Sequence, residues 1–181
     1  MRYLILVISG ILLYVSSTPG SGQVSVKGVH LCCGGCQEIA NAALSEVQDL
    51  ADISCDLNTK VISFKASSEK AAQAGIEALA DAGFFGEATF NKEPLKYPAS
   101  GAEKDSKSNA IVLTGVHLCC TACVTASHKA LEDIKGVTLI DIDRNEQTIK
   151  LTGDSIGVPE AVAALNKAGF FCRLQKPEKK K

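Results

Sequence analysis

After its first 22 residues, the chain shows one order of hydrophobic periods that occurs twice. In the first half, Val24 and Val26 alternate with polar residues up to a glycine, which predicts a short β-strand. A stripe with helical spacing follows, made of Cys36, Ile39, Ala40, Ala43, Leu44 and Val47. Two alternating segments around an Asn58-Thr59 turn predict a β-hairpin. A second helix ending at Gly83 and a last strand over 87–90 complete the order βαββαβ.

The second half repeats the first. Residues 28–36 (GVHLCCGGC) return 87 positions later as residues 115–123 (GVHLCCTAC), identical at seven of nine positions. Residues 78–85 (ALADAGFF) match residues 164–171 (ALNKAGFF) in the same way. The hairpin turn of the second copy falls at Asn145-Glu146. The chain is therefore a tandem duplication.

The repeated order predicts an α+β fold of two tandem ferredoxin-like βαββαβ modules. Each module is expected to have a four-stranded antiparallel sheet with both helices on one face. We place the modules at 23–91 and 110–175, because the linker 92–109 carries Pro, Gly and charged residues without apolar periodicity. A charged tail occupies 176–181. Each copy has its own set of core positions, so we expect each to fold separately.

Residues 1–22 have the features of a secretory signal peptide. Arg2 precedes an apolar run of about 13 residues, and small or turn-forming residues follow it. The run is shorter than the ~20 residues that a spanning helix needs, which favours cleavage over anchoring. We expect a secreted or periplasmic protein with no membrane span after signal removal. Such compartments are oxidising, so disulfide formation must be weighed for every cysteine.

The composition directs attention to sulfur. With 46% hydrophobic and 22% charged residues the chain has the composition of a globular protein, and its net charge of −1 gives no reason to expect nucleic-acid binding. Eight cysteines, no Trp and a single Met are the departures from ordinary usage. Function is therefore sought at the cysteines.

A βαββαβ unit with Cys-x-x-Cys between its first strand and first helix resembles the heavy-metal-associated domain. This family includes copper chaperones and small periplasmic metal-binding proteins, and the resemblance covers both repeats. It implies a metal ion as cargo, a metal-transporting or metal-accepting protein as partner, and no enzymatic activity. The thiolate ligands that it implies are Cys33 and Cys36 in the first repeat and Cys120 and Cys123 in the second. It also implies that Phe84 and Phe170 lie close to the thiols.

The cysteine loops depart from the family pattern. Each loop is two residues longer, and Leu31 or Leu118 occupies the position of the usual methionine. The added upstream residues are candidate accessory ligands, namely Cys32, Cys119, His30 and His117. Each extra cysteine is either a third ligand or a spare thiol, because neighbouring side chains diverge. Each histidine is either a ligand or, as we favour, a loop residue packed on the sheet edge.

The chemistry of the CCxxC loop favours soft ions. Two thiols three positions apart at a helix start can face one ion, and the helix amides lower a nearby thiol pKa. Soft sulfur ligands favour Cu(I), while Zn(II) and Hg(II) are competitors. Recruitment of an extra cysteine and a histidine would complete a four-ligand zinc set. Of the remaining cysteines, Cys55 is interpreted as a buried hydrophobe and Cys172 as core or accessory ligand.

The sequence thus predicts a non-enzymatic protein that captures soft metal ions, with Cu(I) favoured, and transfers them by ligand exchange outside the cytoplasm. Two alternatives stay open. One is a thiol–disulfide oxidoreductase, in which Cys33 or Cys120 attacks and Cys36 or Cys123 resolves. The other is a duplicated interaction module whose cysteines are oxidised.

Overall fold

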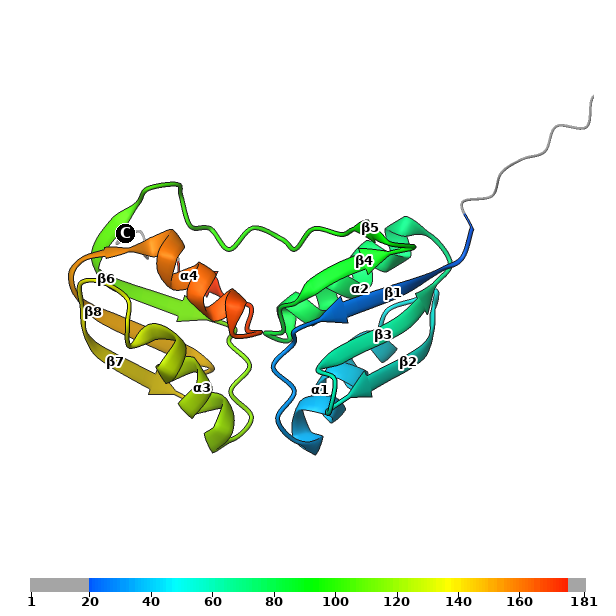
Figure 1. Cartoon of the computed structure of the whole chain (residues 1–181), viewed down its shortest axis with the longest axis horizontal. Helices are drawn as coiled ribbons and strands as arrows, with labels where there is room; N and C mark the ends of the chain where they lie inside the picture. Colours follow the sequence, from blue (N-terminus) through cyan, green and yellow to red (C-terminus); the bar gives the residue numbers. More distant parts are fainter. Residues whose placement is uncertain (1–19, 176–181) are drawn as a thin grey trace, which may run out of the picture.

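The computed structural model describes residues 20–175, so most of the predicted leader and all of the predicted charged tail lie outside the described residues. Two modules lie side by side and meet near the middle of the molecule (Figure 1). Within the described range, the helices are all too short or too polar to cross a membrane. The predicted fold class is confirmed, because each repeat forms an antiparallel sheet with two helices.

The first repeat forms a sheet with strand order β2-β3-β1-β4-β5, in which all neighbours are antiparallel. Its elements are β1 (Gly22–Lys27), α1 (Gly34–Ser45), β2 (Leu50–Asp56), β3 (Val61–Ala66), α2 (Glu69–Asp81), β4 (Glu87–Phe90) and β5 (Glu93–Pro94). The two-residue β5 extends the expected four-stranded sheet. It lies in the segment interpreted as linker, which has no apolar periodicity to indicate a strand.

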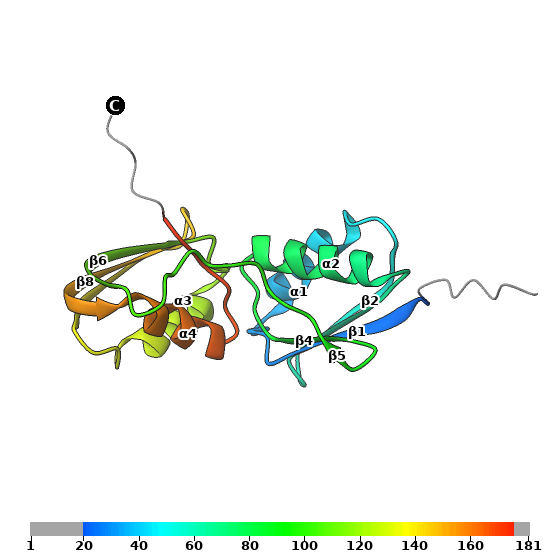
Figure 2. The ribbon, with the colours of Figure 1, turned by 90° about the horizontal axis from the view of Figure 1, so that it is seen from above.

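The second repeat forms a four-stranded sheet with the order β7-β8-β6-β9. Its elements are β6 (Lys107–Thr114), α3 (Thr121–Leu131), β7 (Val137–Asp143), β8 (Thr148–Gly157), α4 (Val158–Lys167) and β9 (Arg173–Leu174). Strand β6 begins within the segment interpreted as linker. Seen from above, α1 and α2 cover one side of their sheet, while α3 and α4 lie on the opposite side of the molecule (Figure 2).

Local chemistry explains where the helices begin and end. The Ser68 side chain accepts a hydrogen bond from the Ala71 amide and so caps α2. Helix α4 begins with Pro159 in its first turn, as the sequence predicts. Gly83 and Gly169 follow α2 and α4 with φ of 82° and 89°, in the left-handed region that favours glycine. The chain turns sharply at both positions, and the two turns face each other.

These turns join the modules. Phe84 and Phe170 form an antiparallel β-bridge, and both side chains are fully buried. The amide of Phe85 donates to the Gly169 carbonyl at 3.1 Å, and the amide of Phe171 donates to the Gly83 carbonyl at 2.9 Å. The repeated Ala-Gly-Phe-Phe motif therefore packs against its own duplicate.

The connecting segment crosses both modules as a strap over residues 95–106 (Figures 1 and 2). The Leu95 amide donates to the Ala88 carbonyl, and the Leu174 amide donates to the Ser100 carbonyl. Between these points the Tyr97 ring lies 4.5 Å from the Phe85 ring and 5.9 Å from the Phe171 ring, measured between centroids. The strap thus contacts the cores of both repeats.

Candidate metal centre

The two cysteine loops connect the first strand of each repeat to its first helix. Gly28 and Gly115 end these strands with φ of 75° and 68°, which turns the chain away from the sheet. Leu31 and Leu118 are buried in the core, where they anchor each loop. The following cysteines are thereby held at the module surface that faces the other repeat.

Each Cys-x-x-Cys motif spans a helix start. Cys33 and Cys120 are the N-cap residues of α1 and α3, and neither side chain makes a capping hydrogen bond. Cys36 and Cys123 lie in the first turn and are fully buried. The sulfurs therefore lie close to the free backbone amides at the helix starts. Because they do not cap the helices, they are available as metal ligands.

Six sulfurs from the two loops meet in one six-thiol cluster, consisting of Cys32, Cys33 and Cys36 with Cys119, Cys120 and Cys123. Within the repeats, the Cys33 and Cys36 sulfurs are 3.8 Å apart and those of Cys120 and Cys123 are 3.7 Å apart. Contacts between the repeats are as close. The Cys32 sulfur lies 3.4 Å from that of Cys120, and the Cys36 sulfur lies 3.5 Å from that of Cys119. The structure thus brings together every thiol that the sequence placed in two separate loops.

The distances fit coordination by more than two sulfurs. With metal–thiolate bonds of about 2.3 Å, ligands lie about 4.6 Å apart in a linear site, about 4.0 Å apart in a trigonal one and about 3.8 Å apart in a tetrahedral one. Nine sulfur pairs of the cluster lie within 4.0 Å, from 3.4 Å between Cys32 and Cys120 to 4.0 Å between Cys36 and Cys123. These pairs are spaced for three or four ligands around an ion.

The two histidines flank the cluster and pack against the opposite repeat. The His30 ring stacks on Phe170 at 4.4 Å, and the His117 ring lies 4.2 Å from Phe84. His117 is 1% exposed, and its Nε2 has no hydrogen-bond partner. Burial lowers the pKa of His117 to about 4, so the ring is neutral at ordinary pH. A buried, neutral and unpartnered imidazole nitrogen is a competent metal ligand.

Three thiols lie close to the His117 ring. Ligand atoms of Cys36, His117, Cys119 and Cys123 all lie within 4.8 Å of one another. On the other side of the cluster, His30 forms a three-residue group with Cys32 and Cys123.

The thiols of the cluster ionise unequally. Hydrogen bonding with the backbone of Cys123 lowers the pKa of the Cys120 thiol to about 6. Burial opposes ionisation of Cys36, but hydrogen bonds from the loop backbone and from neighbouring thiols outweigh it and lower its pKa. Burial raises the pKa of Cys32, Cys119 and Cys123. Cys36 and Cys120, one thiol of each repeat, thus ionise more readily than Cys32, Cys119 and Cys123.

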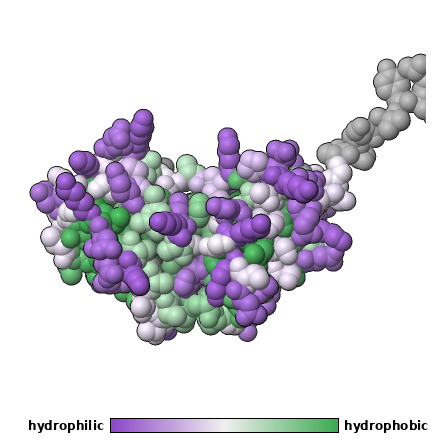
Figure 3. Space-filling view, in the orientation of Figure 1, coloured by the Kyte–Doolittle hydropathy of each residue, from purple (hydrophilic) through white to green (hydrophobic). Residues whose placement is uncertain are grey.

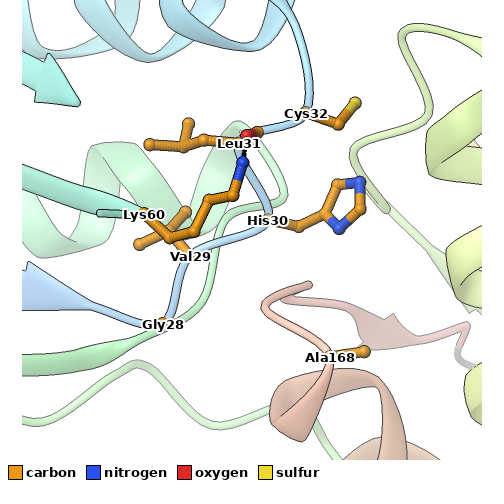
Figure 4. Close-up of a pocket in the computed structure, with 7 residues that line it drawn as sticks. All are labelled: Gly28, Val29, His30, Leu31, Cys32, Lys60 and Ala168. Carbon is orange, nitrogen blue, oxygen red and sulfur yellow. Dashed lines mark hydrogen bonds between the residues drawn. The ribbon is translucent and has the colours of Figure 1, made fainter. Parts of the chain in front are cut away.

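A cleft of about 230 Å³ lies beside the cluster, and its lining includes the loop from Gly28 to Cys32 (Figure 4). Lys60 closes one side, and its ammonium donates to the Leu31 carbonyl. Its counterpart in the second repeat is Gln147, whose carbonyl accepts from Val116 as that of Lys60 accepts from Val29. At this position a positive charge therefore flanks the first loop but not the second, next to a site that becomes anionic when its thiols ionise.

The other two cysteines lie away from the cluster. Cys55 is 5% exposed, and its thiol donates to the Asn41 side chain at 3.3 Å. Cys172 is fully buried, and burial raises its pKa to about 12. All eight cysteines are free thiols in the structure.

On the face seen in Figure 3, hydrophilic side chains cover much of both modules and a paler, more apolar zone lies between them.

The sequence assigns each candidate ligand to its loop but does not show that the two loops meet. Nothing in either loop specifies how one module is oriented relative to the other. The available signal was the duplicated Phe84-Phe85 and Phe170-Phe171 motif, because two adjacent large apolar residues after a helix leave one of them to be covered by another surface.

Comparisons with known proteins give a match among solved structures. A scan of protein-family models finds no match, and a search of curated proteins finds none. Oxidized MerP from Ralstonia metallidurans CH34 is 20% identical over 39% of this chain and all of its own, with a TM-score of 0.36. The heavy-metal-associated domain of a copper chaperone for superoxide dismutase is 21% identical over 48% of this chain and 90% of its own, with a TM-score of 0.35.

One similar structure spans both repeats. The N-terminal soluble domains of Bacillus subtilis CopA are 15% identical over 90% of this chain and 99% of their own, with a TM-score of 0.33. The fold of the present chain is assigned from its own strand order and helix packing. The similar structures are heavy-metal-associated domains, the family that the sequence resembles.

Proposed function

We propose that this protein is a non-enzymatic, extracytoplasmic carrier of soft metal ions, with Cu(I) as its favoured cargo. The single observation that carries the proposal is the six-thiol cluster, in which every sulfur has neighbours 3.4–4.0 Å away and the two thiols at the helix starts make no capping hydrogen bond. Thiolate is the ligand that selects Cu(I) over hard cations. The location rests on the signal-peptide features of residues 1–22.

The arrangement suits transfer as well as capture. Cys36 and Cys123 are fully buried, whereas Cys33 and Cys120 at the helix starts are only half-buried. An incoming thiolate from a partner forms a new metal–sulfur bond at the half-buried side. One protein thiolate then leaves and takes up a proton, so the ion changes hands without being released and without changing oxidation state. The partner is therefore a metal-transporting or metal-accepting protein that presents thiols.

Zn(II) is a second candidate cargo because of one observation. The unpartnered Nε2 of His117 adds nitrogen to Cys36, Cys119 and Cys123, and three sulfurs with one nitrogen form a common structural zinc set. Sulfur alone is sufficient for Cu(I), so the involvement of His117 separates the two cargoes.

The test is a competition titration of the reduced mature protein with Cu(I) and Zn(II) in the absence of oxygen. We expect Cu(I) to bind first and to pass to a dithiol acceptor. A Cys36→Ser/Cys123→Ser protein should lose binding, whereas a Cys55→Ser/Cys172→Ser protein should keep it, because those thiols lie away from the cluster. Failure of the wild-type protein to bind either metal would contradict the proposal.

A disulfide-exchange assay on the same samples addresses the enzymatic alternative. We expect no turnover of a protein disulfide beyond one equivalent per thiol pair. Catalytic turnover that depends on Cys33 or Cys120 would favour an oxidoreductase. Cell fractionation and determination of the mature N-terminus test the extracytoplasmic location. A cytoplasmic protein that retains residues 1–22 would contradict it.

A further inference from the structure

The distances between the six sulfurs indicate how many ions the cluster can hold and which sulfurs would bind each ion. A three-sulfur site needs three thiols in mutual contact. Among the described thiols, no set of three within one repeat has all its sulfurs within 4.0 Å of one another, because the Cys32–Cys33 and Cys119–Cys120 pairs are farther apart than that. Every triangle of mutually contacting sulfurs takes ligands from both repeats.

Four triangles share their edges in a continuous strip. They are Cys32–Cys120–Cys123, Cys32–Cys36–Cys123, Cys36–Cys119–Cys123 and Cys33–Cys36–Cys119. Cys36 and Cys123 each belong to three of the four, and they are the two thiols that are fully buried in the middle of the cluster. Cys33 and Cys120 each belong to one triangle at an end of the strip. The buried pair is thus placed to bridge ions, and the outer thiols to complete the coordination of single ions.

We propose that the two repeats bind Cu(I) together as one polynuclear thiolate cluster, with Cys36 and Cys123 as bridging ligands and up to four ions in the four triangles. This inference rests on the function proposed above and specifies it. Thiolate sulfur has several lone pairs and can bridge two soft ions. Each Cu(I) that binds displaces thiol protons and forms bonds to sulfur, without a redox step.

The strip also explains the departure of this chain from a two-cysteine loop. Cys32 and Cys119 each belong to two triangles and make four of the five sulfur contacts within 4.0 Å that cross between the repeats, the fifth being Cys36–Cys123. Without them, no triangle would remain, because each of the four contains one of these two residues. The additional cysteine is therefore the residue that converts two Cys-x-x-Cys pairs into one shared site.

The decisive experiment is an anaerobic Cu(I) titration of the full mature chain, read by native mass spectrometry and by X-ray absorption. We expect more than two Cu(I) ions per monomer, three sulfurs around each copper, and a copper–copper scattering shell. A limit of two ions per chain, each with two sulfurs and no copper–copper shell, would overturn the shared cluster while leaving soft-metal binding intact. Failure to bind copper would overturn the proposed function as well.

Cys119→Ser provides the matched variant, because it removes two of the four triangles and leaves both Cys-x-x-Cys pairs in place. We expect its copper capacity to fall to about half that of the wild-type protein, with circular dichroism showing the same fold. Cys55→Ser is the control and should keep the full capacity. If Cys119→Ser binds as much copper as the wild-type protein, the cluster does not use the second repeat's additional cysteine and the inference is wrong.

Discussion

Cys32 and Cys33 show how two adjacent thiols can each contact both loops. The Cys32 sulfur lies 3.5 Å from that of Cys36 in its own repeat and 3.4 Å from that of Cys120 in the other. The Cys33 sulfur lies 3.8 Å from that of Cys36 and 3.8 Å from that of Cys119 in the other repeat. Each thiol therefore contacts the start of its own helix and a different cysteine of the opposite repeat.

His117 is the residue whose substitution best distinguishes the two cargoes. Replacing it by Phe keeps an aromatic ring against Phe84 but removes both ring nitrogens, one of which lies within 4.8 Å of three thiol sulfurs. We expect His117→Phe to weaken Zn(II) binding by at least about tenfold, or about 1.4 kcal/mol, and to change Cu(I) binding by less than about threefold. Isothermal titration against a competing chelator measures both.

His128 provides the control for that substitution. It lies on α3, is half-exposed and pairs only with Glu132 at 3.8 Å. His128→Gln should leave the affinities for both metals unchanged. Equal loss of Zn(II) and Cu(I) in His117→Phe would instead show that the histidine supports the packing of the modules rather than a zinc set.

At the scale of elements, the turns after α2 and α4 hold the cysteine loops in place. A Cβ atom on Gly83 would lie 2.3 Å from the His117 backbone nitrogen, and one on Gly169 would lie 2.3 Å from that of His30. The backbone of each turn thus touches the loop that carries the thiols of the other repeat. The two contacts are equivalent under the duplication, so they fix the loops relative to each other.

Gly83→Ala tests this contact. The added methyl group must displace the second loop, so we expect the copper capacity to fall to about two ions per chain while each Cys-x-x-Cys pair still binds. Gly101→Ala is the matched control, because Gly101 has a similar φ of 87° but its added Cβ would meet only the Leu174 Cβ at 3.7 Å. Both variants bear the left-handed strain of about 1–3 kcal/mol, but only Gly83→Ala should lose copper. Wild-type capacity in Gly83→Ala would show that the turn does not position the loop.

The helices and strands of each repeat could be predicted because the spacing of hydrophobic residues indicates which face of each element is buried. Each assignment could be compared with the second copy because the chain is duplicated. Strand β5 and the strap could not be predicted in the same way. Leu95 and Tyr97 are isolated apolar residues in a polar segment, and the Tyr97 ring packs against Phe85 of one repeat and Phe171 of the other. The six-thiol cluster forms only because of how the two modules are oriented relative to each other. The sequence of either module does not specify this orientation.

At the scale of the whole molecule, the repeats are joined by the strap with Tyr97, by the paired turns at Phe84 and Phe170, by an ion pair between Arg173 and Asp81 at 2.7 Å, and by the six-thiol cluster. The strap and the turns bury side chains with or without metal. The cluster contributes only thiol contacts until an ion binds. Metal binding therefore acts as an additional crosslink between two modules that each have a hydrophobic core.

Because the ligands come from both repeats, copper should stabilise both together. Free ligand at about 100 times its Kd adds about 2.7 kcal/mol to the free energy of unfolding, which corresponds to a rise in Tm of roughly 5–10 °C for a chain of this size. Amide hydrogen exchange in α2 and α4 reports on each repeat, and we expect copper to slow exchange in both helices. In a Cys33→Ser/Cys36→Ser protein, the remaining thiols can form only the triangle of Cys32, Cys120 and Cys123, so any stabilisation by copper should be much smaller. If copper protects one helix of the wild-type protein and leaves the other unchanged, the repeats bind metal independently.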